Sequence, residues 1–115
     1  MKRAYIQVST TVAKAADARA IARALVTRRL AACVQVSGPI TSTYWWRGNI
    51  ETAREWLCVA KTRRSLYAKV EAAIKELHPY EVPEIVATPI TAASAEYLAW
   101  LDAETIISAR PPRRR

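Results

Sequence analysis

The order in which strand-like and helix-like segments follow one another is the feature that most constrains this chain. Residues 5–12 alternate in polarity and are rich in β-branched side chains, which predicts a strand. A helix of about 14 residues is predicted next, because apolar residues recur there at three- and four-residue spacing. This apolar stripe consists of Ala18, Ile21, Ala22, Leu25 and Val26.

The middle of the chain is predicted to form a β-hairpin. Residues 32–46 form a long β-like run, which Gly38-Pro39 interrupts, most simply as a bulge or bend. Arg47-Gly48-Asn49 is a turn signal, and a second strand runs through residues 56–60. A hairpin is the simplest arrangement of two such strands joined by a short turn.

Two cysteines are the only sulfhydryl groups of the chain. If the hairpin turns near Asn49, Cys58 lies opposite Ile40. Cys33 is then on the order of 23 Å from Cys58, at about 3.3 Å per residue. A disulfide needs Cα atoms within about 7 Å of each other, so we expect two free thiols.

The second half of the chain is predicted to contain a second helix, a last strand and a short final helix. Thr62 is expected to cap a second helix, and His78-Pro79 ends it, because proline disfavours a helical residue before it. A last strand is predicted over Pro83–Ile90, where its prolines indicate a sheet edge. Ser94 begins a short final helix. The apolar face of the second helix consists of Leu66, Val70, Ala73, Ile74 and Leu77.

These elements predict an α+β fold of the ferredoxin-like βαββαβ type, a sandwich with one extra C-terminal helix. Two helices cover one face of such a sheet. Residues 56–60 and 85–87 are apolar at consecutive positions, which indicates that both faces of those strands are buried. We therefore expect a second subunit to cover the other face.

The chain of 115 residues is long enough for one domain, predicted over residues 1–109. Residues 110–115 follow as a basic tail, predicted to be disordered. The net charge is +8, from 18 basic and 10 acidic residues. Four arginines lie in the tail, so the body carries about +4, an ordinary value for a small domain. The charge alone therefore does not indicate a nucleic-acid-binding protein.

Several classes of protein are excluded by what the sequence lacks. It has no run of 18 apolar residues to span a membrane. The polar Gln7 comes too early for a signal peptide, so a cytoplasmic location is expected. A single histidine excludes a multi-histidine metal cage within one subunit, and two glycines cannot build a glycine-rich phosphate loop. No Gly-x-Ser-x-Gly motif supports a catalytic triad with His78.

The densest polar cluster is His78–Glu84, which holds an imidazole, a phenol and two carboxylates between two prolines. Stiff prolines lower the entropy cost of holding such groups together, which suits a small ligand or a divalent metal. Alternatively, His78 caps the preceding helix and both glutamates are solvated. Cys33 and Tyr44-Trp45-Trp46 can likewise be explained by packing.

Five segments together resemble the CutA family of divalent-cation tolerance proteins. The similarity covers roughly residues 5 to 102, essentially the whole domain, with the segments in the family's order. The segments are Arg29–Val34 (Arg-Leu-Ala-Ala-Cys-Val), Ile40–Gly48 (Ile-Thr-Ser-Thr-Tyr-Trp-Trp-Arg-Gly), Lys61–Arg64, His78–Ile85 and Tyr97–Leu101.

The resemblance implies a ferredoxin-like subunit in a homotrimer, similar in architecture to the PII signalling proteins. It also implies a link to tolerance of copper and other divalent cations, with no catalysed reaction. Cys33, His78, Glu81 and Glu84 are the matched residues with metal-ligand chemistry. Thiolate and imidazole favour Cu²⁺ or Zn²⁺ over Mg²⁺ or Ca²⁺.

A PII-like signalling module that binds a small anion or a protein partner is the alternative function. Its ligand would meet Lys61, Arg63 and Arg64 near the start of the second helix, where anions bind readily. Tyr80 and Trp45 are further candidates for such a site.

Two other classes of protein share this order of elements. An RNA-recognition domain needs aromatic residues that residues 54–61 do not provide, so nucleic acid is not an expected partner. An acylphosphatase needs a phosphate-binding arginine after the first strand, and residues 11–16 contain none.

Overall fold

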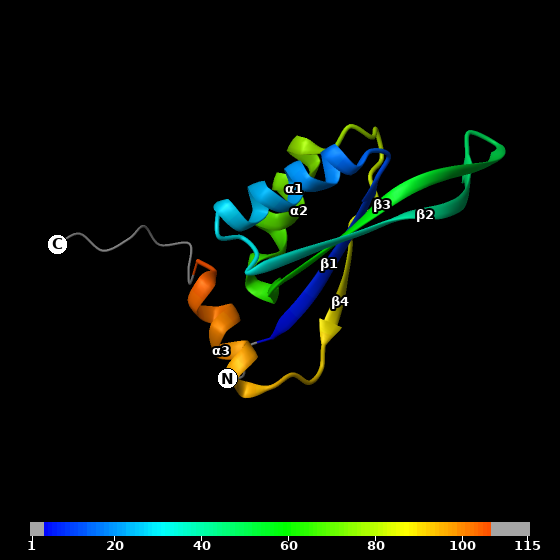
Figure 1. Cartoon of the computed structure of the whole chain (residues 1–115). Helices are drawn as coiled ribbons and strands as arrows, with labels where there is room; N and C mark the ends of the chain where they lie inside the picture. Colours follow the sequence, from blue (N-terminus) through cyan, green and yellow to red (C-terminus); the bar gives the residue numbers. More distant parts are fainter. Residues whose placement is uncertain (1–3, 107–115) are drawn as a thin grey trace.

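The computed structural model describes residues 4–106 (Figure 1). The predicted domain of residues 1–109 extends slightly beyond this range, and the predicted tail of residues 110–115 lies outside the described residues. The elements are β1 (Tyr5–Val12), α1 (Ala15–Thr27), β2 (Cys33–Trp46), β3 (Asn49–Arg63), a 3-10 turn (Arg64–Leu66), α2 (Tyr67–Leu77), β4 (Val86–Ile90) and α3 (Ala95–Glu104).

The four strands form one sheet in the order β2-β3-β1-β4, with every neighbouring pair antiparallel. Helices α1 and α2 lie side by side on one face of this sheet (Figure 1). This confirms the ferredoxin-like α+β prediction, including the place of β4 at a sheet edge. Among residues 4–106, no helix is long and apolar enough to cross a membrane.

The hydrophobic core lies between this helix pair and the sheet. Ile21 and Leu25 of α1 are each 1% exposed, and Val70 and Ile74 of α2 are fully buried. They pack with apolar side chains of the central strands, such as Val8. The periodic stripes read from the sequence are therefore the core faces of both helices, except that Val26 is 42% exposed.

The hairpin of β2 and β3 extends well beyond the helix layer, to the right in Figure 1. It turns at Arg47-Gly48, where both residues adopt positive φ angles of 51° and 81°. The predicted irregularity at Gly38-Pro39 is confirmed, since the register shifts between Ser37 and Ile40. The predicted pairing of Cys58 was wrong, however.

Cys58 pairs with Val36, not with Ile40, because the turn lies at Arg47-Gly48, before Asn49, and the irregularity between Ser37 and Ile40 shifts the register by one further residue. Cys33 pairs with Lys61, at the end of the hairpin closest to α1. Both cysteines are nevertheless free, as expected.

Two further boundaries differ from the sequence prediction. Thr62 does not cap α2: it lies within β3, pairs with Ile6, and donates a hydrogen bond from Oγ1 to the Leu30 carbonyl at 2.6 Å. The 3-10 turn of Arg64–Leu66 lies between β3 and α2, so α2 begins only at Tyr67. Strand β4 begins at Val86 rather than Pro83, because residues 79–85 form an irregular loop.

Helix α3 begins as predicted, since the Ser94 hydroxyl accepts a hydrogen bond from the Tyr97 amide at 3.1 Å. The other end of α3 is held by Arg63, whose side chain is 2% exposed. Arg63 Nε donates to Thr105 Oγ1 at 3.0 Å and lies 3.7 Å from Asp102 Oδ1. A guanidinium at the end of β3 thus joins the sheet to the C-terminal helix.

Candidate functional site

An open cleft of about 890 Å³ lies between the β2–β3 hairpin and the loop of residues 79–85, and is hereafter the acidic cleft. One wall comes from the hairpin and the other from the loop. Its lining combines aromatic rings with three carboxylates: Thr11, Ser42, Thr43, Tyr44, Trp45, Trp46, Glu55, Pro79, Tyr80, Glu81, Val82, Pro83 and Glu84. The cleft therefore contains four residues named from the sequence, Trp45, Tyr80, Glu81 and Glu84.

His78 anchors the loop that forms one wall of the acidic cleft. Its backbone amide ends α2 by donating to the Ile74 carbonyl at 2.8 Å. The ring Nδ1 of His78 accepts a hydrogen bond from the Tyr80 backbone amide at 3.1 Å. In a neutral imidazole the other ring nitrogen, Nε2, then carries the proton, and it donates to the Thr11 carbonyl at 2.8 Å. Both ring nitrogens of this buried imidazole are therefore used within the fold.

Tyr80 reaches from the loop to β3. Its hydroxyl donates to Glu55 Oε2 at 2.8 Å, and Glu55 is only 5% exposed. Burial and, secondly, this carboxylate raise the pKa of Tyr80 above its ordinary value. The sequence reasoning missed Glu55. The available signal was a charged residue directly before the apolar run of residues 56–60, on a strand predicted to be buried on both faces.

Glu81 lies at the exposed rim of the acidic cleft. Its Oε1 forms an ion pair with Arg47 Nη2 at 3.0 Å, and the Arg47 guanidinium lies 5.3 Å from the centre of the Trp46 ring. Glu84 is the third carboxylate of the lining. The Arg47 guanidinium is thus held at the rim of the acidic cleft by the Trp46 ring and the Glu81 carboxylate together.

Cys33 is not close to the loop within one chain. It pairs with Lys61, which pairs with Gln7 of β1, whereas His78 contacts Thr11. Gln7 and Thr11 are roughly 13 Å apart along the strand, at about 3.3 Å per residue. Ligands of one copper or zinc ion lie about 2.0–2.3 Å from it, so Cys33 and His78 of one chain cannot share an ion.

A complete metal site is absent from the described part of a single chain. Among residues 4–106, no three His, Cys, Asp or Glu side chains converge closely enough to hold one ion. Residues 4–106 of one chain therefore do not fit a preformed copper or zinc centre. The loop supplies two exposed carboxylates, an incomplete ligand set.

The basic residues named for an anion site lie at the other end of the sheet from Tyr80 and Trp45. Arg63 is committed to Thr105 and α3, as described above. Lys61 lies 5.9 Å from the centre of the Tyr97 ring. Burial and, secondly, the neighbouring Cys33 raise the pKa of Tyr97. Arg64 is exposed in the 3-10 turn.

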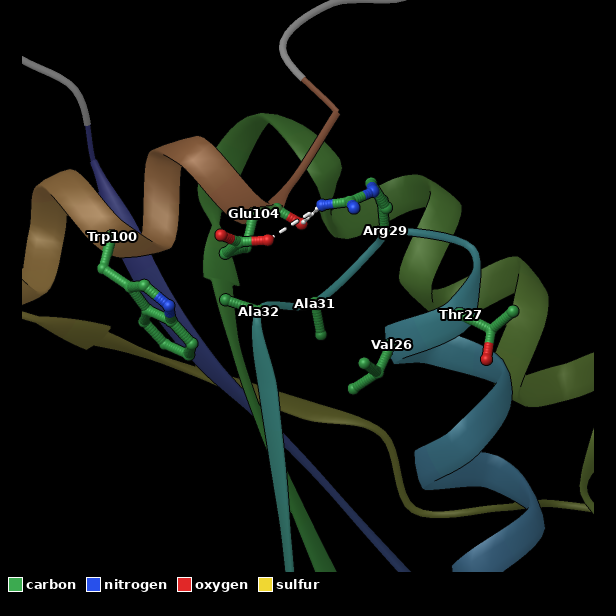
Figure 2. Close-up of a pocket in the computed structure, with 7 residues that line it drawn as sticks. All are labelled: Val26, Thr27, Arg29, Ala31, Ala32, Trp100 and Glu104. Atoms are coloured by element: carbon green, nitrogen blue, oxygen red, sulfur yellow. Dashed lines mark hydrogen bonds and ion pairs between the residues drawn. The ribbon is translucent and has the colours of Figure 1, made fainter.

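A smaller cavity of about 360 Å³ lies between the end of α1 and α3. In Figure 2, Trp100 and Val26 face it, and a dashed line joins Arg29 to Glu104. The distance from Arg29 Nη1 to Glu104 Oε1 is 2.9 Å. It contains none of the candidate ligands named from the sequence. Its ion pair joins the loop after α1 to the end of α3, which is a structural role.

The fold and the cleft together define a ferredoxin-like α+β protein with an acidic, aromatic cleft beside the hairpin. A family model described as CutA1 divalent ion tolerance protein matches residues 6–104. The chain therefore belongs to the CutA1 family of divalent ion tolerance proteins.

Individual relatives agree with this assignment. The divalent-cation tolerance protein CutA of Thermus thermophilus is 46% identical over 98 residues, which cover 85% of this chain and 95% of the relative. The crystal structure of CutA1 from Oryza sativa matches with a TM-score of 0.88 and 37% identity, covering 91% of this chain and 96% of that one. The structure of a CutA from Archaeoglobus fulgidus that is named periplasmic matches with a TM-score of 0.84 and 37% identity, covering 87% and 97%. The chain spans about half the length of the curated relatives from rice, mouse and human.

Proposed function

We propose that this protein binds divalent metal ions as a homotrimer, Cu²⁺ more tightly than Zn²⁺, without catalysing a reaction. The site is shared between two copies: the His78–Glu84 loop of one copy and Cys33 of another. The observation that carries this proposal is the distance between Cys33 and the His78–Glu84 loop: Cys33 lies at the end of the hairpin that is farther from this loop. A metal site that uses both Cys33 and the loop must therefore draw on two chains.

Exposed apolar side chains support the assembly. Trp45, Ile50 and Val82 are 71%, 63% and 69% exposed, and Val86 on the edge strand β4 is 48% exposed. Isolated apolar residues on a surface are common, but large ones gathered on a long hairpin, a loop and an edge strand indicate contact with another protein surface. Further copies of this chain would bury them.

The chemistry of the loop supports a cation as the ligand. Glu84 is an exposed carboxylate, Glu81 is exposed but must exchange its ion pair with Arg47 for the metal, and Cys33 is half-buried rather than sealed in the core. His78 can join the site only by giving up one of its two hydrogen bonds. The carboxylates are therefore the first ligands expected to act, with the thiol adding preference for copper and zinc.

We place the protein in the cytoplasm. Two free thiols without a disulfide fit a reducing compartment. Fractionation of cells that produce the untagged chain tests this assignment: we expect the protein in the cytoplasmic fraction, and recovery in another compartment would contradict it.

Calorimetric titration of Cu²⁺ and Zn²⁺ into the assembled protein tests the metal proposal. The double variant Glu81→Gln, Glu84→Gln is expected to lose most copper binding, because each substitution removes an anionic ligand and keeps the side-chain size. Glu96→Gln, an exposed glutamate of α3, is the matched control and is expected to bind normally. Equal copper affinity in the double variant and the control would contradict a metal site at the loop.

A further inference from the structure

The cavity of about 360 Å³ between the end of α1 and α3 has apolar walls that the core does not use. Val26 and Trp100 line it, and each is 42% exposed. Val26 belongs to the apolar stripe predicted for α1, yet it faces this cavity together with Trp100 (Figure 2). Ligand pockets have volumes of about 300–1,000 Å³, so this one suits a ligand of the size of a single amino acid.

The same cavity presents one positive and one negative side chain. Arg29 Nη1 donates to Glu104 Oε1 at 2.9 Å, and the two side chains are 57% and 43% exposed. Among residues 4–106, Arg29 Nε and Nη2 and Glu104 Oε2 have no further partner. An ion pair this exposed contributes little to stability, so it can adjust around a ligand. Donors and an acceptor are therefore available side by side.

The backbone fixes the position of Arg29 at the cavity. Arg29 follows the last turn of α1 with a positive φ of 59°, a conformation that glycine adopts without strain and arginine does not. Its carbonyl accepts the Ile106 amide at 3.0 Å, which holds the loop after α1 against the end of α3. The guanidinium and the carboxylate are thus held near each other before any ligand arrives, which lowers the entropy cost of binding.

We propose that this cavity binds a free α-amino acid with an apolar side chain. Its α-carboxylate accepts hydrogen bonds from Arg29, its α-ammonium group donates to Glu104, and its side chain packs against Val26 and Trp100. A simple anion would be repelled by Glu104 and a simple cation by Arg29, whereas a zwitterion complements both charges.

This inference goes beyond the proposed metal function. The lining contains none of the proposed metal ligands. It also contains none of the exposed apolar side chains assigned above to contact between copies, Trp45, Ile50, Val82 and Val86.

Calorimetric titration of leucine into the full chain tests the proposal, with EDTA present because amino acids chelate copper and zinc. We expect saturable binding of one leucine per chain. 4-Methylpentanoate has the same carbon skeleton but no α-ammonium group. It is expected to bind about tenfold more weakly or worse, through loss of the charge-assisted hydrogen bond to Glu104.

Glu104→Gln removes the negative charge but keeps an acceptor for Arg29. This variant is expected to lose the preference for leucine over 4-methylpentanoate, a change that a merely structural role of Glu104 would not produce. Trp100→Ala is expected to weaken leucine binding by removing an apolar wall. Glu96→Gln on α3 and Arg28→Gln beside Arg29 are matched controls, because neither residue lines the cavity, and both are expected to keep the affinity and the preference of the wild type.

Absence of saturable leucine binding by the folded wild-type protein would overturn the proposal. So would a Glu104→Gln variant that keeps the wild-type preference, or a Trp100→Ala variant that keeps the wild-type affinity. These results would leave the copper titrations unaffected. Conversely, Cys33→Ser is expected to lose copper binding and to bind leucine normally.

Discussion

Tyr80 shows at the scale of one residue how the loop responds to pH. Its pKa is higher in the folded protein than its ordinary value of about 10, through burial and the Glu55 carboxylate. The folded state therefore holds this proton more tightly than the unfolded state. The corresponding stability is complete below about pH 10 and is lost as the pH rises above it.

Urea denaturation at pH 9 and pH 11 measures this effect. Tyr80→Phe is expected to lower the free energy of unfolding at pH 9 by about 1–3 kcal/mol, because Glu55 loses its buried donor. The variant should then lose less additional stability than the wild type between pH 9 and pH 11. An equal loss in both proteins would contradict a role for Tyr80 in the alkaline transition.

Individual site residues differed in how far the sequence could predict them. His78 could be placed at the end of a helix because Pro79 follows it. Its partner Thr11 could not be predicted, because the two are 67 positions apart and the contact exists only once β1 and α2 are packed. Glu55 was missed for the same reason: its importance arises from Tyr80, which reaches it from a different element.

At the scale of elements, periodicity predicted most of the fold. Strands and helices with clear alternation or stripes, such as β1 and α1, have the expected extents. The errors fall where local signals compete with pairing between strands. Thr62 resembles a helix cap locally, but its pairing with Ile6 and its bond to Leu30 keep it in β3. The register of the hairpin depended on the position of the turn and on the irregularity between Ser37 and Ile40, and the sequence located neither closely enough to pair Cys58 correctly.

Attachment of α3 is expected to depend on Arg63. Arg63→Ala removes the donor to Thr105 and leaves Asp102 without its charged neighbour, so the free energy of unfolding should fall by about 3 kcal/mol. Arg28→Ala removes an exposed pair with Glu76 and should change it by less than about 1 kcal/mol. Urea denaturation followed by tryptophan fluorescence measures both. Equal effects would contradict a special role for the buried guanidinium.

At the scale of the whole molecule, the assembly is expected to be inseparable from folding, because the hairpin and edge strand expose large apolar side chains. Light scattering on the purified chain should give three times the subunit mass of 12.9 kDa at micromolar concentration. A stable, folded monomer under those conditions would contradict the homotrimer.

The central claim is that one metal site draws on two copies of the chain, and co-assembly of two defective variants tests it most directly. Cys33→Ser lacks the thiol, and Glu81→Gln, Glu84→Gln lacks the loop carboxylates, so each assembly alone should bind little copper. When the two variants are expressed together, some interfaces pair an intact loop with an intact Cys33. We predict that calorimetry then recovers a fraction of the wild-type copper sites. Mixed assemblies that bind no more copper than the better of the two variants alone would contradict the claim.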